Sequence, residues 1–127
     1  MMYSNAIMNE FYNPANFGVI RGANGVGKVV CEQGDEIIKI FITVEGDKIT
    51  AAEFQTFGGV VAIALTSFAN NLMIGKTLKE ASKISTVDVL KLAESVPENR
   101  MYLVHAVVNC VHLAVESVSK KGAKDVD

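Results

Sequence analysis

Polar residues near the C-terminus recur at a spacing that could serve metal binding. His105, Asn109, His112 and Glu116 follow one another at intervals of four, three and four residues. On a helix these intervals place the four side chains on one face. His112 and Glu116, one turn apart, carry the imidazole and carboxylate groups that bind metal ions. A polar stripe of this kind is more often the solvated face of an amphipathic helix, and this is the interpretation we favour.

The two cysteines, Cys31 and Cys110, are too few for the disulfide framework of a small secreted protein. We therefore expect reduced thiols and a cytoplasmic location. Cys110 shares a helical face with Leu103, Val107 and Ala114. A free cysteine in such a stripe behaves as a small hydrophobic residue, so we predict a structural role for Cys110.

The sequence lacks the signatures of several function classes. The glycine-rich stretch GANGVG at 22–27 matches neither the dinucleotide fingerprint nor a phosphate-binding loop. Neither a Ser-His-Asp pattern nor a catalytic pair of carboxylates is present, so we do not expect an enzyme. A net charge of −2 gives no basic field for nucleic acid. Since no apolar run approaches the roughly 20 residues of a membrane span, and no secretory signal opens the chain, we expect no membrane contact.

Apolar periodicity, glycines and prolines predict one short helix, three strands and then a series of helices. The helix at 3–12 stops before Asn13-Pro14, and the glycine-rich residues 16–27 form a turn-rich connection. A tight turn at Gly46-Asp47 joins two of the strands as a hairpin. The pattern changes from strand to helix after Gly58-Gly59, and a capping box at Thr77 opens a further short helix. The charged tail at 121–127 is expected to fray. The predicted strands are 29–33, 36–44 and 48–57, and the main helices are 60–74, 86–94 and 97–120.

These elements predict an α+β fold in a single domain, 1–127, with an ordered core at about 3–120. Half of the residues are apolar, which suits a globular domain of this length. Short consecutive strands form an antiparallel meander, because a parallel pair would need a long crossover. The expected architecture is a three-stranded antiparallel sheet, preceded by one short helix and covered on one face by the C-terminal helices.

Several strings along the chain occur together in a recognisable order. They are YSNAIMNEFYNPANFG at 3–18, GVG at 25–27, Gly34-Asp35, FQTFG at 54–58 followed by AIA at 62–64, GKTLKEA at 75–81 and PENRM at 97–101. As an ordered set they resemble the iron–sulfur cluster assembly scaffolds of the IscU/NifU N-terminal type. The chain is identified as a divergent member that lacks the usual cysteine ligands.

The resemblance implies a SufE/NifU-like fold and a role as a scaffold rather than a catalyst. Members of this family receive sulfur from a cysteine desulfurase and iron from a donor. They assemble a 2Fe–2S cluster on three cysteines and an aspartate, and some bind zinc at the same place. Thiolates are the soft ligands that such clusters and zinc prefer, and a carboxylate adds a weaker, exchangeable bond. The implied partner is a cysteine desulfurase or another iron–sulfur assembly protein.

The positions that match the family's ligands read Gln33, Asp35, Gly59 and Leu103. Of the four, only Asp35 keeps the family's residue type, and one carboxylate cannot hold a binuclear cluster. Cys31 lies two residues before Gln33, on the same face of a regular strand. A site made by Cys31 and Asp35 is therefore an alternative, although a packed strand cysteine is the favoured interpretation.

Three functions follow as hypotheses. The first is a scaffold-like protein of iron–sulfur cluster assembly that cannot hold a standard 2Fe–2S cluster and carries neither cluster nor zinc. The alternative is a metal-free degenerate paralogue that serves as a partner-binding or regulatory module. A third is a small-molecule pocket in the emptied site, lined by Phe17, Phe57, Tyr102 and Leu103.

Overall fold

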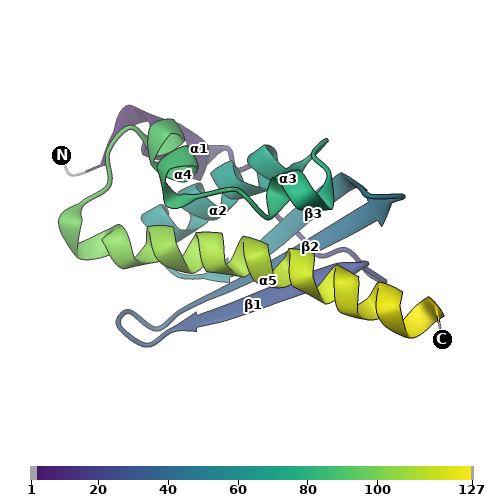
Figure 1. Ribbon diagram of the computed structural model, residues 1–127. Helices are drawn as coiled ribbons and strands as arrows, with labels where there is room; N and C mark the ends of the chain where they lie inside the picture. The colour runs from purple at the N-terminus through teal and green to yellow at the C-terminus, as the bar shows by residue number, and fades with distance from the viewer. Residues whose placement is uncertain (1–2, 127) are drawn as a thin grey trace.

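The computed structural model describes residues 3–126, and these form the predicted α+β fold (Figure 1). A three-stranded antiparallel sheet follows one short N-terminal helix, and the remaining helices come after the sheet in the chain. The predicted fold class is therefore confirmed. In chain order the elements are α1 (Asn5–Tyr12), β1 (Gly25–Cys31), β2 (Glu36–Glu45), β3 (Lys48–Phe57), α2 (Val60–Met73), α3 (Leu78–Ala81), α4 (Thr86–Ala93), η1 (Glu98–Arg100) and α5 (Met101–Val126).

The sheet is a meander in the order β1-β2-β3. Gly46 adopts a φ of +65° in the turn between β2 and β3, a conformation that glycine reaches without steric cost. Side chains alternate between the two faces of each strand. On β2 the inward face carries Ile38, Ile40 and Ile42, which are fully buried. This alternation also decides which side chain of β2 points into the candidate site described below.

Strand β1 begins at Gly25 and ends at Cys31, so the predicted strand at 29–33 and the turn-rich connection to residue 27 were wrong. The reason is a contact with α5. A Cβ atom at Gly27 would lie 2.8 Å from the backbone N of Ala114, and one at Gly25 would lie 2.5 Å from the O of Ala114. These glycines let the helix backbone approach the strand, so they serve packing within a strand instead of turn formation.

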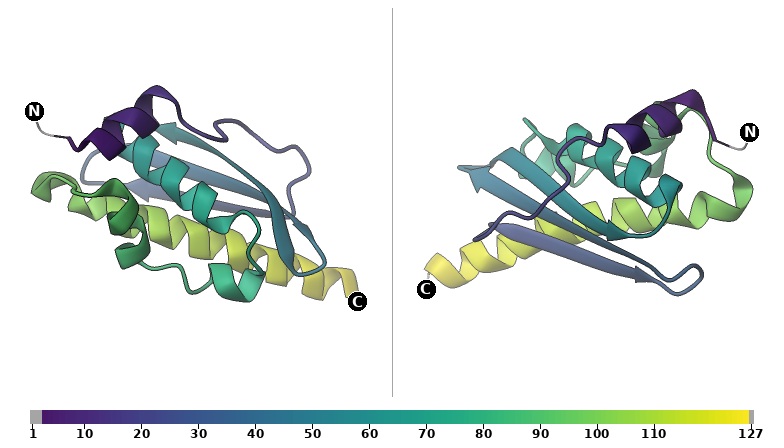
Figure 2. Two further views of the ribbon diagram at one scale, coloured as in Figure 1. Left: turned by 90° about the horizontal axis from the view of Figure 1, so that it is seen from above. Right: turned by 180° about the vertical axis from the view of Figure 1, so that it is seen from behind.

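The helices cover one face of the sheet, with α5 along β1 and α2 against β3 (Figures 1 and 2). α1 and α4 pack against α2 on its outer side. Gly75, at a φ of +89°, follows the end of α2 as predicted. The capping box at Thr77 is also confirmed, since its hydroxyl accepts from the N–H of Glu80 at 3.0 Å.

Helix α5 starts at Met101, after the short 3-10 helix η1, and not in the turn at Pro97. It continues to Val126, beyond the predicted end at residue 120. Residues 121–126 are thus helical in the structure, Asp127 lies outside the described residues, and the fraying of the tail stays a prediction.

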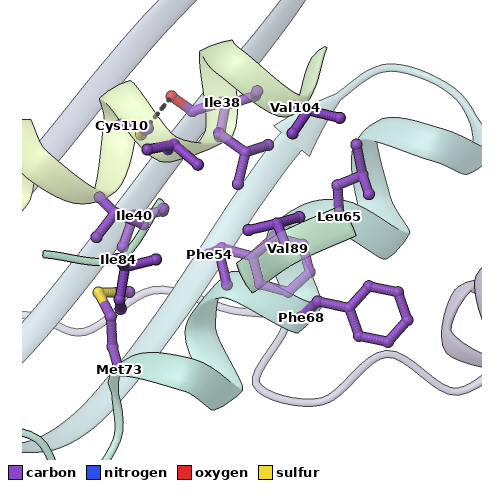
Figure 3. Packing of buried hydrophobic residues seen from close by; sticks show 14 of the residues in the cluster. Ile38, Ile40, Phe54, Leu65, Phe68, Met73, Ile84, Val89, Val104 and Cys110 are labelled. Atoms are coloured by element: carbon purple, nitrogen blue, oxygen red, sulfur yellow. Dashed lines mark hydrogen bonds between the residues drawn. The ribbon is translucent and has the colours of Figure 1, made fainter. Parts of the chain in front are cut away.

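The hydrophobic core lies between the sheet and the helices (Figure 3). Cys110 is fully buried there, and its Sγ lies 3.6 Å from the carbonyl oxygen of Ile38. The predicted structural role of this cysteine is confirmed. Burial raises the pKa of the Cys110 thiol to about 12, which keeps it protonated near neutral pH.

One helical stretch, Glu98–Val118, is long and apolar enough to cross a membrane, with a mean hydropathy of 1.4. The expectation that no stretch reaches this length does not hold by that criterion. Half of the apolar window is buried inside the fold, where α5 packs on the sheet. A core helix of a globular protein meets the same test, and this position accounts for its apolar character.

Candidate functional site

The positions that match the family's ligands lie at one end of the sheet, on three separate segments. Gln33 and Asp35 are exposed in the turn between β1 and β2, where Asp35 adopts a φ of +62°. Gly59 is exposed at the N-cap of α2, and an added Cβ atom there would meet no heavy atom within 4 Å. Leu103, in the first turn of α5, is only 1% exposed and belongs to the core.

The side chain between these segments is Glu36, the first residue of β2. It shares the inward face of the strand with Ile38 and Ile40, and it is only 7% exposed. A carboxylate is rarely buried without a partner, because removing its charge from water is costly. Glu36 therefore requires a hydrogen-bond donor or a positive charge nearby.

The phenol of Tyr102, from the second residue of α5, donates its hydrogen to the Glu36 carboxylate. The Tyr102 oxygen lies 2.8 Å from Oε2 and 3.0 Å from Oε1. The two residues are 66 positions apart in the sequence. This bond therefore joins the β1–β2 end of the sheet to the start of α5.

Two glycines leave room for the Glu36 side chain. A Cβ atom at Gly34 would clash with Tyr102 Oη and lie 2.8 Å from Glu36 Oε2. A Cβ atom at Gly58 would lie 2.8 Å from Glu36 Cγ. Gly58 directly precedes the N-cap of α2, and a negative charge is favourable beside a helix N-terminus. Glu36 thus packs against both the β1–β2 turn and the junction between β3 and α2.

Burial and the carboxylate set the acidity of the neighbouring groups. The pKa of Tyr102 is raised, first by burial and then by its hydrogen bond to Glu36 and the charge of that residue. The pKa of the Cys31 thiol is also raised, mainly by burial and further by the charge of Glu36. Both groups therefore stay protonated near neutral pH, and a protonated thiol is a poor nucleophile.

Cys31 is 6% exposed and pairs with Glu36 across the end of β1 and β2. It packs in the core cluster, whereas Asp35 is exposed in the turn. Within residues 3–118, whose side chains the structure describes, no three His, Cys, Asp or Glu side chains are grouped closely enough to hold a metal ion. The arrangement places a thiol beside a buried carboxylate that already has a hydrogen-bond donor.

An open hollow of about 530 Å³ lies beside this pair, between the end of β1 and the start of α5. Tyr102 and Cys31 are in its wall, together with Gln33, His105 and Asn109. A different groove, of about 370 Å³, contains Phe17 and Phe57.

The four residues proposed for a small-molecule pocket are therefore not brought together. Leu103 is in the core, Tyr102 borders the hollow, and the two phenylalanines border the groove.

The polar stripe of α5 is placed as predicted, but it is not entirely solvated. His105, Asn109 and Glu116 are exposed. His112 is half-buried, and its Nε2 lies 2.9 Å from the carbonyl oxygen of Ile84. His112 therefore ties α5 to the segment before α4.

Glu36 is the site residue that the sequence analysis missed. The available signal was its parity in the strand, because it shares the inward positions of β2 with Ile38 and Ile40. A charged residue in that register predicts a buried carboxylate that needs a donor. The identity of the donor, Tyr102, depends on the packing of α5 and has no local signal.

The donors present do not fit the three-cysteine and aspartate set that the family resemblance implies. Gln33 offers an amide, Gly59 has no side chain, and Leu103 is apolar and buried. Glu36 and Tyr102 occupy the space among the same segments.

Comparisons with known proteins agree with this fold and with the order of the motifs. The model of the NifU-like N terminal domain matches residues 2–125. The iron–sulfur cluster assembly scaffold protein IscU 1 of Archaeoglobus fulgidus is 33% identical over 123 residues, which are 97% of this chain and 80% of that protein. The nitrogen fixation protein NifU of Nostoc sp. is 37% identical over 110 residues, and the match covers 79% of this chain and 36% of that longer protein.

Solved structures show the same architecture. A NifU-like N-terminal protein from Brucella abortus superposes with a TM-score of 0.77 at 14% identity, over 93% of this chain and 94% of that one. A SUF-system scaffold protein from Fervidobacterium islandicum gives a TM-score of 0.71 at 18% identity, over 89% and 96% of the two chains. The family match along nearly the whole chain shows that this protein belongs to the NifU-like N-terminal domain family.

Proposed function

We propose that this protein is a scaffold-like component of iron–sulfur cluster assembly that acts by binding partner proteins and does not hold a standard 2Fe–2S cluster. The observation that carries the proposal is the combination of a family match over residues 2–125 with a site that lacks thiols at all three family positions. The chain has the fold of the family but not its three cysteine ligands.

The uncovered face of the sheet supports partner binding. Val30 is 57% exposed and Phe57 is 76% exposed on this face, beside a groove that also contains Lys28 and Lys39. The two lysines are directly opposite each other across β1 and β2. Like charges so placed destabilise a sheet, whereas an acidic partner would neutralise both. Exposed apolar residues gathered on one face are typical of protein interaction sites.

The partner that the family implies is a cysteine desulfurase. The test is direct binding, by calorimetry, to the desulfurase encoded in the same genome. Phe57→Ser is expected to weaken the complex at least tenfold. Val87→Ser, at a 56% exposed position on α4, is the matched control and should leave binding unchanged. Absence of any complex with the unsubstituted protein would end this proposal.

Reconstitution separates the scaffold-like protein from a conventional scaffold. The protein is incubated anaerobically with iron, sulfide and desulfurase and then analysed for metal. We expect a colourless protein with less than stoichiometric iron and zinc. Stoichiometric metal that is lost in Cys31→Ser or Asp35→Ala would contradict the metal-free proposal and assign those two residues as ligands.

The alternative, a metal-free partner-binding or regulatory module, is favoured by one observation. Glu36 and Tyr102 fill the space among the family's ligand positions with a hydrogen-bonded pair. Such a module would bind the desulfurase and change its activity without accepting sulfur. Persulfide transferred to this protein, detected by mass spectrometry, would exclude the regulatory version.

A further inference from the structure

Three segments of the chain meet at the Glu36 side chain. They are the β1–β2 turn at Gly34, the β3–α2 junction at Gly58, and the start of α5 at Tyr102. The contacts are close, since Cβ atoms at Gly34 and Gly58 would each lie 2.8 Å from a Glu36 atom. The same three segments carry the positions Gln33, Gly59 and Leu103, where the family has its cysteines.

Connections between these segments would otherwise be weak. Gln33, Gly34 and Asp35 are all exposed, and the N-cap of α2, Gly59, provides no side-chain hydrogen bond. A glycine N-cap gives the first N–H groups of a helix no side-chain acceptor. A side chain that accepts a hydrogen bond from the start of α5 and packs closely against the other two segments therefore has a large effect on order at this end of the sheet.

We propose that the hydrogen bond between Glu36 and Tyr102 replaces a bound metal group as the tie that orders these three segments. The tie needs no metal, since the carboxylate acceptor and the phenol donor are both supplied by the chain. It also leaves no room for a metal beside Gly34 and Gly58, because the Glu36 side chain and the Tyr102 phenol fill that space. This inference rests on the metal-free part of the proposed function but not on partner binding, since a protein that binds no desulfurase would still contain the tie.

The first test removes the phenol oxygen with Tyr102→Phe. The matched control is Tyr12→Phe, the same chemical change at a tyrosine that is 75% exposed. We expect the melting temperature of Tyr102→Phe to fall by roughly 5 °C, because a buried carboxylate loses its donor. Hydrogen exchange at the backbone N–H group of Ile63, which donates to the carbonyl oxygen of Gly59 at 3.2 Å, should accelerate at least tenfold. The control should change neither quantity.

The second test replaces both partners. In Glu36→Leu/Tyr102→Phe no buried charge remains, so the double variant should melt at a higher temperature than Tyr102→Phe alone. In Glu36→Gln the side-chain oxygen still accepts from Tyr102, so protection of the Ile63 N–H group should largely persist. Destabilisations that simply add in the double variant would show that the two residues act separately and would overturn the tie.

The third test asks whether metal contributes to order. Zinc that binds only the folded state would raise the melting temperature according to its affinity and concentration. We expect equal melting temperatures, within about 1 °C, for the unsubstituted protein with excess zinc and with EDTA. A rise of several degrees in zinc would contradict the proposal, whether or not the protein binds a desulfurase.

Discussion

Introducing cysteines at the three family positions tests whether the fold of this domain can still form a cluster site. The perturbation is the triple substitution Gln33→Cys/Gly59→Cys/Leu103→Cys, with Asp35 left in place. The structure gives each substitution a different cost. Gln33 is an exposed turn residue, so its replacement changes stability by no more than about 0.5 kcal/mol.

The cost of the triple substitution is concentrated at one position. Gly59 has a φ of −91°, and an added Cβ atom meets nothing within 4 Å, so a side chain is tolerated there. It stabilises by about 0.5 kcal/mol through the lower entropy of the unfolded chain. Leu103 is 1% exposed, and the smaller cysteine leaves a cavity that costs about 2 kcal/mol. The net loss is about 2 kcal/mol, which a domain with a typical stability of about 5–15 kcal/mol survives.

The assay is anaerobic reconstitution with ferric iron and sulfide, followed by visible absorption and iron analysis. We expect the triple variant to load little iron, since Glu36 still fills the space between Gly34 and Gly58. Adding Glu36→Ala and Tyr102→Phe opens that space, and loading should rise towards ~2 irons per chain, as in a binuclear cluster. The control combines Glu36→Ala and Tyr102→Phe with serines in place of the three new cysteines, and it should load no cluster.

Two results would refute this reasoning. Equal loading of the triple variant with and without the Glu36–Tyr102 pair would show that the pair does not obstruct the site. No loading in the opened variant, if it remains folded by circular dichroism, would show that the three segments are too far apart to share a cluster. In that case the spacing of the three segments, and not only the set of ligands, differs from that of the family.

Three further predictions concern single groups. Because the pKa of Tyr102 is raised on folding, its contribution to stability is complete below the ordinary tyrosine pKa of about 10 and is lost as pH rises through the folded value. Alkaline unfolding should therefore be shallower in Tyr102→Phe, and the last tyrosinate to form in absorbance titration should be missing; an unchanged titration would contradict this. Cys110, with a pKa raised to about 12, should react with a disulfide reagent only after unfolding, and Cys31, which is buried but 6% exposed, should react slowly but earlier; fast labelling of either in the native protein would contradict their burial. Gly27→Ala should destabilise the protein by at least about 2 kcal/mol in urea unfolding, because its Cβ meets the backbone of α5, whereas Gly59→Ala should be neutral or mildly stabilising; equal stabilities would refute the close contact between strand and helix.

Most of the fold was predictable because its signals are local. Residues 48–57 alternate as a strand and end at a glycine pair, and the structure has β3 at Lys48–Phe57. Thr77 and Glu80 form a capping box whose two bonds join residues three apart. Gly75 ends α2 through its own backbone conformation. In each case the residues that determine the boundary are neighbours in the chain.

The start of β1 was not predictable for the opposite reason. Glycines are frequent in turns, and nothing near Gly25 or Gly27 in the sequence indicates a helix packed against them. The contact that requires these glycines is with Ala114, nearly ninety residues later in the chain. The Glu36–Tyr102 bond is hidden in the same way, because its partners are 66 residues apart. The sequence showed which ligands were missing, but it did not show what replaced them.

Glu36 and Tyr102 separate two properties that a metal site combines in one group: binding metal and holding chain segments together. A structural metal contributes about 10–16 kcal/mol to folding in small zinc domains, whereas a hydrogen bond to a charged group contributes about 1.5–3 kcal/mol. The pair can replace a metal only if the rest of the domain is stable by itself. The core meets this condition, since the sheet packs on α2 and α5 through side chains such as Ile40, Phe54 and Leu65, all fully buried. A domain stabilised in this way keeps the surface that a partner recognises after its ligands are gone, so loss of the cysteines need not entail loss of binding.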